Sequence, residues 1–346
     1  MRKLRKHFIL ISKALKNKGK NYSYISIILR LTYWLLKYRG GSVIFFMLNL
    51  HKKGSKIRPI IGIDEFQRIH NKLNPAYYRS LLEDKYIFDR FMKSFNFPLA
   101  EMIGIIMNNN IFWIKENRNE PIENILNYEL DCYFKMHIKF GGLDVHKLEI
   151  HNRIVRVDNN ISDLHSFMKM ISGAMYVLQK TVNQHPEINR INSSCVNTVR
   201  AITIHNGEKA FNFINYLRMG LGNSIVDNIT SGGLASGIHE DGTLFDTAID
   251  RDGTNIWLTH HPDSNVAFNS IKVPFFKESL ELVVKMHECF HCFFIIGWDI
   301  AITESGPVVI EGNPVSELLH EQCFYGGLKK QILEYANSYK KKRGTV

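Results

Sequence analysis

Apolar residues recur at helical spacing in three stretches of the first hundred residues. The pattern in residues 1–18, with Lys and Arg between the apolar positions, predicts a short basic amphipathic helix. Residues 22–39 are apolar almost all round and predict a second helix that ends at the following pair of glycines. Periodicity resumes from Pro75 to Phe97 and stops at the next proline. The apolar positions of the first stretch are Leu4, Phe8, Ile11 and Leu15.

After residue 98 the pattern changes to short apolar runs bounded by turn residues, which is typical of strands. The segments predicted here are strands at 111–114, 131–138, 148–157 and 175–181 and a helix at 162–172. From 196 to 270 the chain alternates strands with turns marked by Asn-Gly, Gly-Gly and Asp-Gly pairs. A helix at 277–293 precedes a last strand pair and a C-terminal helix. This order predicts an α+β fold with antiparallel sheets.

Basic charge is concentrated at the N-terminus. The first 63 residues contain 15 Lys and Arg but no Asp or Glu, within a formal net charge of +11 for the chain. Three interpretations are open: a helical subdomain with solvated lysines, attachment to an anionic membrane surface, or nucleic-acid binding. No basic motif interleaved with aromatic residues supports the last, so no nucleic-acid partner is expected. Lys340, Lys341, Lys342 and Arg343 form a second basic run near the C-terminus.

Composition is that of a globular protein with two or three subdomains, since 45% of the 346 residues are hydrophobic and 22% are charged. No uncharged apolar run reaches the roughly 18 residues of a membrane span. Five cysteines in a chain of this size form no dense disulfide framework and favour a reducing compartment. We therefore expect a cytoplasmic protein, placed peripherally at the inner face of the cytoplasmic membrane if the basic segment binds lipid.

The most informative stretch is a predicted hairpin with strands at 297–303 and 307–313 and a three-residue loop. In that register Asp299 faces Glu311, and strand alternation places Asn313 on the same face. Facing carboxylates repel unless a cation lies between them. With the Asn313 carbonyl the oxygen set suits Mg²⁺ or Mn²⁺ rather than zinc. The alternative is a hairpin whose acids simply face water.

Several further motifs follow one another along the chain. They are Ser194-Cys195-Val196-Asn197-Thr198-Val199-Arg200, Leu217-Arg218-Met219-Gly220, Val226-Asp227-Asn228 with Gly232-Gly233, His261-Pro262, and Gly297-Trp298-Asp299 with Glu311-Gly312-Asn313. In this order they resemble the sugar-transfer-associated ATP-grasp group (α-L-glutamate ligase-like), which is found with polysaccharide biosynthesis genes. The resemblance covers roughly residues 80–330.

This resemblance implies an ATP-grasp fold, in which two α+β subdomains clamp ATP and two lysines contact its phosphates. In the family the first lysine follows an Asp at the start of a helix, and the pair Asp84-Lys85 matches it. Lys135 matches the second, and the glycine-rich loop is represented by Gly141 and Gly142. The family commonly has a proline after the second lysine and one more glycine in the loop, and this chain has neither. Either lysine could instead be a solvated surface residue. The segment implied to contact adenine is Val177-Leu178-Gln179-Lys180.

The resemblance also implies roles for polar residues near the hairpin. Arg200 and Arg218 would hold the transferred phosphoryl group or an acyl-phosphate, unless either forms a structural ion pair, for instance with Asp227. Asp227 and Asn228 would line the acceptor pocket, or form an Asx turn before the glycine pair.

The domain plan that follows has four parts. They are a basic helical region at 1–75, an ATP-binding lid at 76–185, a subdomain with the Mg²⁺ site at 186–335 and a basic tail at 336–346. His287, Cys289, His291 and Cys292 are interpreted as members of the helix at 277–293, with the cysteines in the core rather than in a metal site.

The implied activity is that of an ATP-dependent carboxylate–amine ligase. A carboxylate would attack the γ-phosphorus to give an acyl-phosphate and ADP, and an amine would then form an amide on a uronic acid or amino-acid substituent of a surface polysaccharide such as a capsule. Two alternatives stay open: a sugar kinase with the same phosphate machinery, and a non-catalytic nucleotide-binding scaffold at the membrane.

Overall fold

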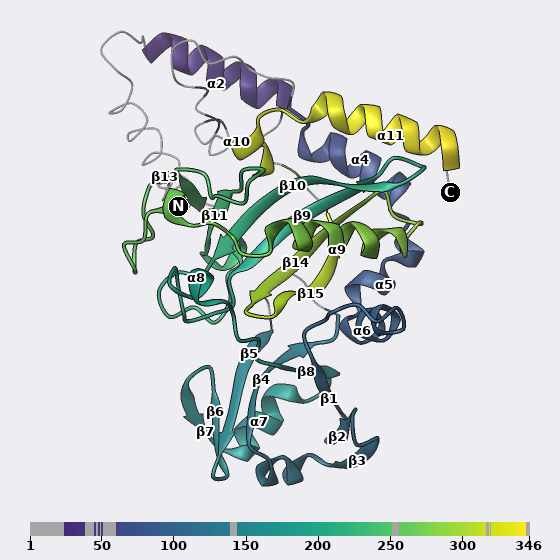
Figure 1. Ribbon diagram of the computed structural model, residues 1–346, viewed down its shortest axis with the longest axis vertical. Coiled ribbons are helices and arrows are strands. Elements are labelled where there is room, and N and C mark those ends of the chain that lie inside the picture. The colour runs from purple at the N-terminus through teal and green to yellow at the C-terminus, as the bar shows by residue number, and fades with distance from the viewer. Residues whose placement is uncertain are drawn as a thin grey trace.

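The computed structural model describes residues 24–38, 45, 48, 50, 60–138, 144–250, 256–315, 318 and 320–343. They form a smaller lobe and a larger body (Figure 1). Each part is built on one antiparallel sheet. The predicted α+β class is confirmed.

The smaller lobe consists of an eight-stranded sheet in the order β3-β2-β1-β8-β4-β5-β6-β7. A short 3₁₀ helix, η2 (Ile122–Asn127), and α7 (Leu164–Ile171) complete it, and Phe134 and Phe167 are buried in its core. Asp163 begins α7 by accepting a hydrogen bond from the Ser166 N–H. The strands are β1 (Met102–Met107), β2 (Asn110–Trp113), β3 (Arg118–Pro121), β4 (Leu130–Met136), β5 (Val145–His151), β6 (Ile154–Val157), β7 (Asn160–Ser162) and β8 (Tyr176–Lys180).

The larger body contains a seven-stranded sheet in the order β13-β12-β11-β10-β9-β14-β15. Its strands are β9 (Thr198–His205), β10 (Ala210–Met219), β11 (Leu234–Gly237), β12 (Ala248–Asp250), β13 (Ile256–Leu258), β14 (Ile295–Thr303) and β15 (Gly306–Pro314). Its longer helices are α4 (Ile63–Leu73), α6 (Lys85–Lys93), α9 (Phe276–Glu288) and α11 (Lys329–Arg343). Shorter ones are η1 (Ala76–Tyr78), α5 (Ser80–Glu83), α8 (Pro186–Asn189), η3 (Ile229–Ser231), η4 (Phe268–Ser270) and α10 (Glu321–Tyr325).

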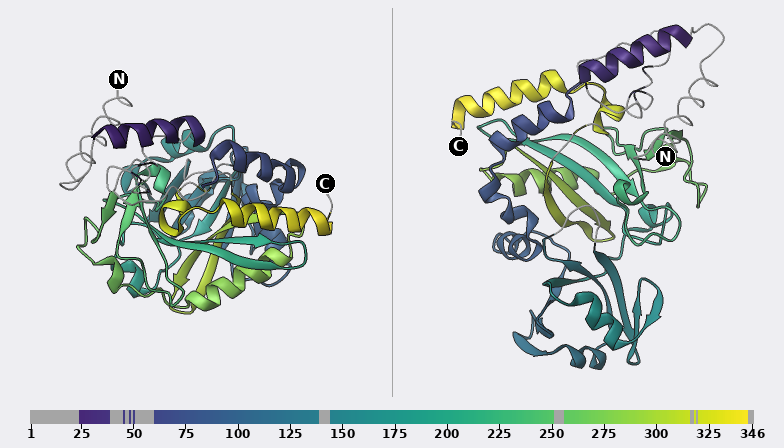
Figure 2. Two further views of the ribbon diagram at one scale, coloured as in Figure 1. Left: turned by 90° about the horizontal axis from the view of Figure 1, so that it is seen from above. Right: turned by 180° about the vertical axis from the view of Figure 1, so that it is seen from behind.

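Helices cover both faces of the larger sheet. On one face α6 and α9 enclose a core in which Phe88 packs near Trp298. On the other face α4, α10 and α11 enclose a second core that contains Phe66 and Tyr339. Figure 2 shows α4 and α11 on the same side of the body, where Lys329 pairs with Glu65. Because the central strands are buried on both faces, they form a rigid base for the side chains at their ends.

Three predicted segments differ from the structure. The helix predicted from Pro75 to Phe97 is broken, because the Asp84 carboxylate accepts hydrogen bonds from the Tyr86 and Ile87 N–H groups and starts α6 as a new helix. The strand predicted at 148–157 is a hairpin that turns where Asn152 and Arg153 adopt positive φ. The helix predicted at 277–293 ends at Glu288, so His291 and Cys292 lie beyond it.

The hydrophobic cores divide the chain differently from the predicted boundaries. Leu82, Phe88 and Met92 belong to the core of the larger body, although the lid was predicted to start at residue 76. At the other end, Ala336 and Tyr339 are buried against the larger sheet, in the segment predicted as a basic tail. The core of the smaller lobe therefore draws on residues from β1 to β8, with η2 and α7, but on none of α6.

The described N-terminal residues include one long helix, α2 (Tyr24–Tyr38), which agrees with the helix predicted at 22–39. Ile27 and Trp34 are buried, whereas Ile25, Ile28 and Leu29 are more than half exposed. The helix predicted in residues 1–18 and the Gly40-Gly41 stop lie outside the described residues. No described helix has both the length and the apolar character needed to cross a membrane.

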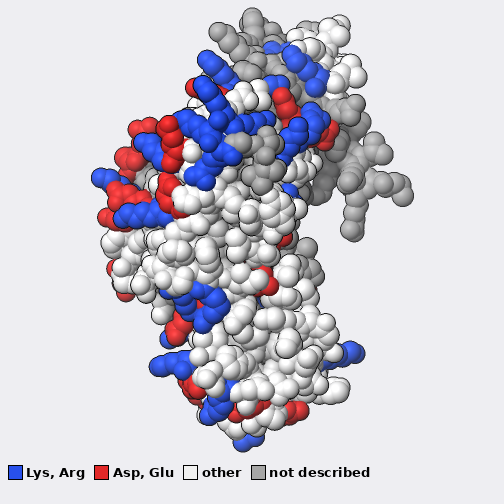
Figure 3. All heavy atoms as spheres, turned by 90° about the vertical axis from the view of Figure 1, so that its right-hand side faces the viewer, with Lys and Arg blue, Asp and Glu red and all other residues white. Residues whose placement is uncertain are grey.

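Basic residues at the end of α11 make contacts within the body. Lys342 pairs with Glu208, and the Arg343 guanidinium lies 3.3 Å from Nε2 of His205 and 3.2 Å from Nδ1 of His291. His205, His291 and Glu288 lie close enough together to ligate a metal, but this guanidinium contacts both imidazoles. In Figure 3, Lys and Arg side chains on the upper part of the molecule are interspersed with Asp and Glu. The C-terminal charge therefore helps to fix α11.

His287 makes stability depend on pH. Its Nε2 lies 3.1 Å from the Phe293 carbonyl oxygen and its Nδ1 lies 2.7 Å from the Thr203 hydroxyl, which fits a neutral ring that donates through Nε2. Burial lowers the pKa of His287 to about 3. Because this lies below the pKa of about 6.5 in the unfolded chain, falling pH favours the unfolded state.

We expect wild type to lose about 2 kcal/mol more unfolding free energy than His287→Gln between pH 7 and pH 5. Urea unfolding at the two pH values measures this difference. His151→Gln, at an exposed position, should match wild type. Equal losses in wild type and His287→Gln would show that His287 can be protonated in the folded state.

Candidate functional site

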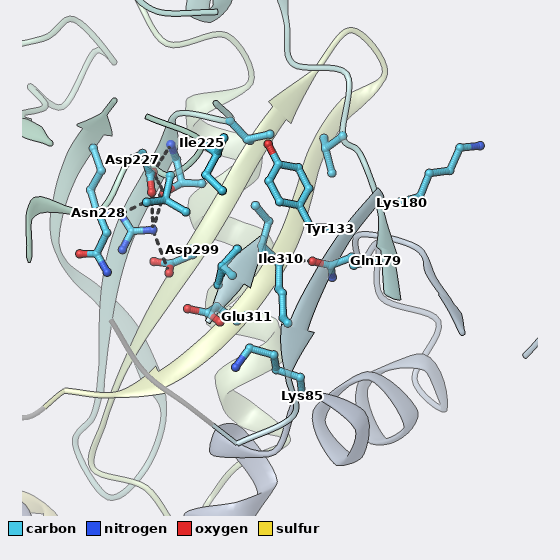
Figure 4. Close-up of a pocket in the computed structure, with 17 residues that line it drawn as sticks. Lys85, Tyr133, Gln179, Lys180, Ile225, Asp227, Asn228, Asp299, Ile310 and Glu311 are labelled. Atoms are coloured by element: carbon cyan, nitrogen blue, oxygen red, sulfur yellow. Dashed lines mark hydrogen bonds and ion pairs between the residues drawn. The ribbon is translucent and has the colours of Figure 1, made fainter. Parts of the chain in front are cut away.

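A cleft between the two lobes collects most of the predicted site residues (Figure 4). The lobes meet above and below it, where short β-bridges join Asp84 to Ile138 and Leu99 to Val309. Residues of β4 and β8 line the cleft from the smaller lobe, and residues of β9, β10, β14 and β15 line it from the larger body. The lining side chains are Lys85, Tyr133, Lys135, Val145, Gln179, Lys180, Val182, Val196, Thr198, Arg218, Ile225, Val226, Asp227, Asn228, Asp299, Ile310 and Glu311.

The hairpin of β14 and β15 pairs the two acids as predicted, but its turn length and register differ from the prediction. The turn has two residues rather than three, so Thr303 pairs with Gly306 and Ala301 with Val308. A bulge at Ile310 then shifts the register by one residue and restores the pairing of Asp299 with Glu311. The bulge also brings Ile310, predicted for the opposite face, to line the cleft.

The three predicted metal ligands lie together at the base of the cleft. Asp299 is only 1% exposed, so the interpretation in which both acids simply face water is wrong for this residue. The Asn313 amide nitrogen lies 3.0 Å from Glu311 Oε1 and 3.4 Å from Asp299 Oδ2. Rotating this amide would present its oxygen beside the two carboxylates.

Two arginines hold Asp299 from the opposite side. Arg200 Nε lies 2.5 Å from Asp299 Oδ1, and Arg218 contacts Asp299 Oδ2 at 3.0 Å. Arg218 also pairs with Asp227 at 3.2 Å and donates to the Thr198 hydroxyl. Both arginines therefore form ion pairs, one of the two possibilities that the sequence left open. Arg218 also lines the cleft, and both arginines line a neighbouring chamber.

The two carboxyl groups differ in their preference for charge. Burial raises the pKa of Asp299 to about 6, against the opposing effect of Arg200 and Arg218. Burial also acts on Glu311, but the ammonium groups of Lys85 and Lys135 outweigh it and lower the pKa of Glu311 to about 2. The positive charges of the two lysines thus favour the ionised form of Glu311 near the end of β15.

The two predicted lysines come from different elements, α6 and β4. Lys85 is the first residue of α6, and its N–H donates to the His137 carbonyl across the lobe junction. Lys135, near the end of β4, places its ammonium 2.6 Å from Gln179 Oε1. Burial lowers the pKa of Lys135 to about 8, which favours a nearby anion. Two cations beside buried acids have the charge pattern that a polyphosphate with its counter-cation would require.

The predicted adenine-contacting segment is strand β8, which runs along the cleft. Gln179 lines the cleft and Val177 borders a small cavity beside Lys135. Leu178 is fully buried in the core of the smaller lobe, so only its main chain could meet a ligand. The Lys180 side chain points away from the acids (Figure 4). Gly141 and Gly142 lie outside the described residues.

Asp227 and Asn228 line the cleft as predicted for an acceptor pocket, and Asn228 also caps η3 through the Thr230 N–H. Gly233 is required here, because a Cβ at this position would lie 2.4 Å from the Asp227 carbonyl oxygen. The Asx turn predicted for this segment is therefore confirmed at Asn228, and its place in an acceptor pocket stays a prediction.

Sequence reasoning missed several lining residues. Thr198 donates to Asp227 and accepts from Arg218, and it appeared in a quoted motif without a role. Tyr133 and Ile310 also line the cleft. Tyr133 lies two residues before Lys135 on β4 and therefore shares its face of the strand, which was the one available signal for it.

The residues present fit a hard divalent cation. Two facing carboxylates and an amide are all oxygen donors when Asn313 is rotated, and no His or Cys lies among them. Asp299, Glu311 and Asn313 are therefore the residues that could hold Mg²⁺.

Comparison with known proteins gives a family match over most of the chain. A model of the sugar-transfer associated ATP-grasp family matches residues 65–334. No curated protein matches the sequence. Among solved structures, carboxyaminoimidazole ribonucleotide synthase from Aspergillus clavatus with ATP is 8% identical, with a TM-score of 0.42, and the match covers 73% of this chain and 51% of that one. D-alanine–D-alanine ligase from Bacillus anthracis is 12% identical, with a TM-score of 0.42 and coverage of 76% and 70%. The chain spans about half the length of the former enzyme.

Proposed function

The chain belongs to the sugar-transfer associated ATP-grasp family, and on that premise we propose that it is an ATP-dependent carboxylate–amine ligase. The observation that carries the proposal is the cleft itself. It combines two lysines, Arg218 and a facing pair of acids at the junction of two lobes, and Arg200 contacts one of these acids. Such a constellation suits phosphoryl transfer, in which positioning and charge neutralisation supply most of the catalysis.

In this proposal, ATP enters between β8 and the larger sheet. Lys85 and Lys135 contact the phosphates, and main-chain groups of Val177, Leu178 and Gln179 face the base. Mg²⁺, when held by Asp299, Glu311 and Asn313, would neutralise phosphate charge. Arg218 and Arg200 keep Asp299 in place and present their remaining N–H groups to the reacting oxygens.

The reaction has two balanced steps. A substrate carboxylate oxygen forms a bond to the γ-phosphorus, the bond from that phosphorus to the β,γ-bridging oxygen breaks, and ADP leaves. An amine nitrogen then bonds to the acyl carbon, the bond from that carbon to the phosphorylated oxygen breaks, and phosphate departs with this oxygen. The nitrogen gives up one proton, which the departing phosphate can accept. Arginines beside Asp299 suit both anionic species.

Positional isotope exchange tests the first step. ATP labelled with ¹⁸O in the β,γ bridge should scramble its label when Mg²⁺ and the correct carboxylate are present and no amine is added. Uronic acids and amino acids form the first panel. Formation of a phosphorylated alcohol without carboxylate-dependent exchange would identify a kinase instead. Nucleotide binding that is indifferent to Glu311→Gln, without ADP formation, would identify a scaffold.

We further propose that the product is part of a surface polysaccharide, such as a capsule, and that the enzyme works at the inner face of the cytoplasmic membrane. The family's association with sugar transfer supports the first point. For the second, α2 places Ile25, Ile28, Leu29 and Leu36 on one exposed face, next to a segment rich in Lys and Arg. An apolar face with adjacent basic charge suits an anionic lipid surface.

The membrane proposal predicts a lipid-dependent partition. The full chain should sediment with vesicles that contain anionic lipid and stay in solution with neutral vesicles. Ile28→Ser combined with Leu29→Ser should lower the bound fraction several-fold, because two apolar side chains leave the interface. Ile161→Ser, at an exposed position of β7, is the matched control. Equal binding of both variants would refute a role for α2.

A further inference from the structure

A second chamber adjoins the cleft on the far side of Arg218 and Glu311. It has a volume of about 390 Å³ and shares Arg218, Asn228 and Glu311 with the cleft. Its walls come from α4, α5, α10 and strands β9, β10 and β15. A reactant placed here would therefore meet the nucleotide at the facing acids.

The chamber contains buried polar atoms without a hydrogen-bonding partner among the described residues. His70 is 4% exposed and its Nε2 has no partner, and Glu321 is 6% exposed and its Oε2 has none. The Arg79 Nε is also buried and unpartnered. Such atoms cost free energy in an empty protein. Three of them in one chamber indicate a polar ligand.

The charges on the wall have both signs. Glu321 accepts one hydrogen bond from the Tyr216 hydroxyl and has no salt bridge within the described residues. Arg79 donates to the Asn71 amide oxygen rather than to a carboxylate. Glu83 also lines the chamber. A ligand with only one sign of charge would leave one of these groups buried without compensation.

Buried amides hold the walls in fixed positions. Gln322, next to Glu321, accepts from the Ile61 N–H and donates to its carbonyl. Asn74, at the end of α4, donates to the Ile295 carbonyl and accepts from the Phe294 N–H. These bonds tie α10 and α4 to segments far away in the sequence. The polar atoms of the chamber are thus pre-organised rather than placed on loose side chains.

We propose that this chamber binds a small zwitterion, with Glu321 holding its ammonium group and Arg79 its carboxylate. Amino acids are the simplest class with this chemistry. His70, which burial keeps neutral, supplies a further polar contact. This inference rests on the proposed ligase function, because it assigns one of the two reactants to the chamber.

Ligand binding by the full chain tests the assignment. The probes are the individual proteinogenic amino acids and their D enantiomers, added to protein that is already saturated with Mg²⁺ and a non-hydrolysable ATP analogue. Each amino acid that binds is compared with its 2-hydroxy acid, which lacks the ammonium, and with its amide, which lacks the carboxylate. Calorimetry gives the affinity of each.

Wild type should bind at least one amino acid at least ten-fold more tightly than either analogue. Glu321→Gln should abolish the preference over the hydroxy acid alone, and Arg79→Gln the preference over the amide alone. Glu240→Gln and Arg156→Gln, at exposed positions, should leave both preferences unchanged. This crossed pattern distinguishes direct contact from a general loss of structure.

Failure of this inference is separable from failure of the ligase proposal. If the ATP analogue binds but no amino acid does, or if Glu321→Gln retains the full preference for the ammonium, the zwitterion assignment is wrong and the nucleotide site stands. If the ATP analogue itself fails to bind folded protein, the ligase proposal fails first. Retained binding of the analogue in both variants shows that they are folded.

Discussion

Glu311→Gln should lower ATP-dependent turnover by about 10³-fold. Glu311 lies opposite Asp299 and accepts a hydrogen bond from the Asn313 amide nitrogen at 3.0 Å. It is also the acid whose pKa is lowered by the charges of Lys85 and Lys135. The glutamine side chain is nearly isosteric with glutamate but lacks the negative charge that a bound cation and both lysines need. ADP release at saturating ATP and Mg²⁺ measures the loss.

A matched control lies on the same hairpin. Glu304 is exposed in the turn between β14 and β15, far along the strand from the acid pair. Glu304→Gln should retain turnover within about two-fold, as expected for a surface change. Turnover in Glu311→Gln comparable to wild type would mean that the acid pair does not serve the reaction.

Arg218→Met should reduce the free energy of unfolding by about 3–5 kcal/mol and abolish turnover. The guanidinium is 7% exposed and contacts Asp299, Asp227 and the Thr198 hydroxyl. Methionine fills similar space but leaves buried Asp227 without its ion-pair partner and Asp299 with Arg200 alone. Urea unfolding measures the loss, and the difference from wild type should narrow at lower pH as the Asp299 carboxylate takes up a proton.

Arg156→Met is the control for this substitution, because Arg156 is exposed on β6. Its free energy of unfolding should change by no more than about 0.5 kcal/mol. A small stability loss in Arg218→Met, equal to that of the control, would mean that Asp227 and Asp299 do not depend on this arginine for their burial.

The acid pair shows what the sequence could and could not predict. Alternation along a strand determines which residues share a face, so Asp299, Glu311 and Asn313 were brought together correctly. The predicted turn was one residue too long and the bulge at Ile310 was not predicted. These two errors cancelled at the acids, so that Asp299 still faces Glu311. A bulge leaves no pattern in alternation, because it depends on backbone geometry at one residue.

The chamber was invisible to sequence reasoning for a different reason. Glu321 lies far along the chain from His70 and Arg79, and none of the three belongs to a motif. They meet because α4 and α10 pack on the same face of the larger sheet, and the Gln322 contacts to Ile61 that fix this join residues 261 positions apart. Periodicity predicts a helix and its apolar face, but not which helix will be its neighbour.

The helix start at Asp84 could have been predicted from the sequence. It was noted because it precedes Lys85, yet the helix was predicted to run through it. In the structure its carboxylate caps α6 and its backbone pairs with Ile138 at the lobe junction. An Asp followed by helix-forming residues is a start signal, and using it would have placed the break correctly.

Thermal unfolding with nucleotide tests the central claim most directly, which is that the cleft between the lobes binds ATP together with a divalent cation. Wild type and Glu311→Gln are heated with ATP and Mg²⁺, with ATP and a chelator, and with Mg²⁺ alone. At ~100 times the dissociation constant, ATP with Mg²⁺ should stabilise wild type by about 2.7 kcal/mol and raise Tm by several degrees. Glu311→Gln should lose most of that shift. An unchanged Tm in folded wild type, or a full shift in Glu311→Gln, would contradict the account.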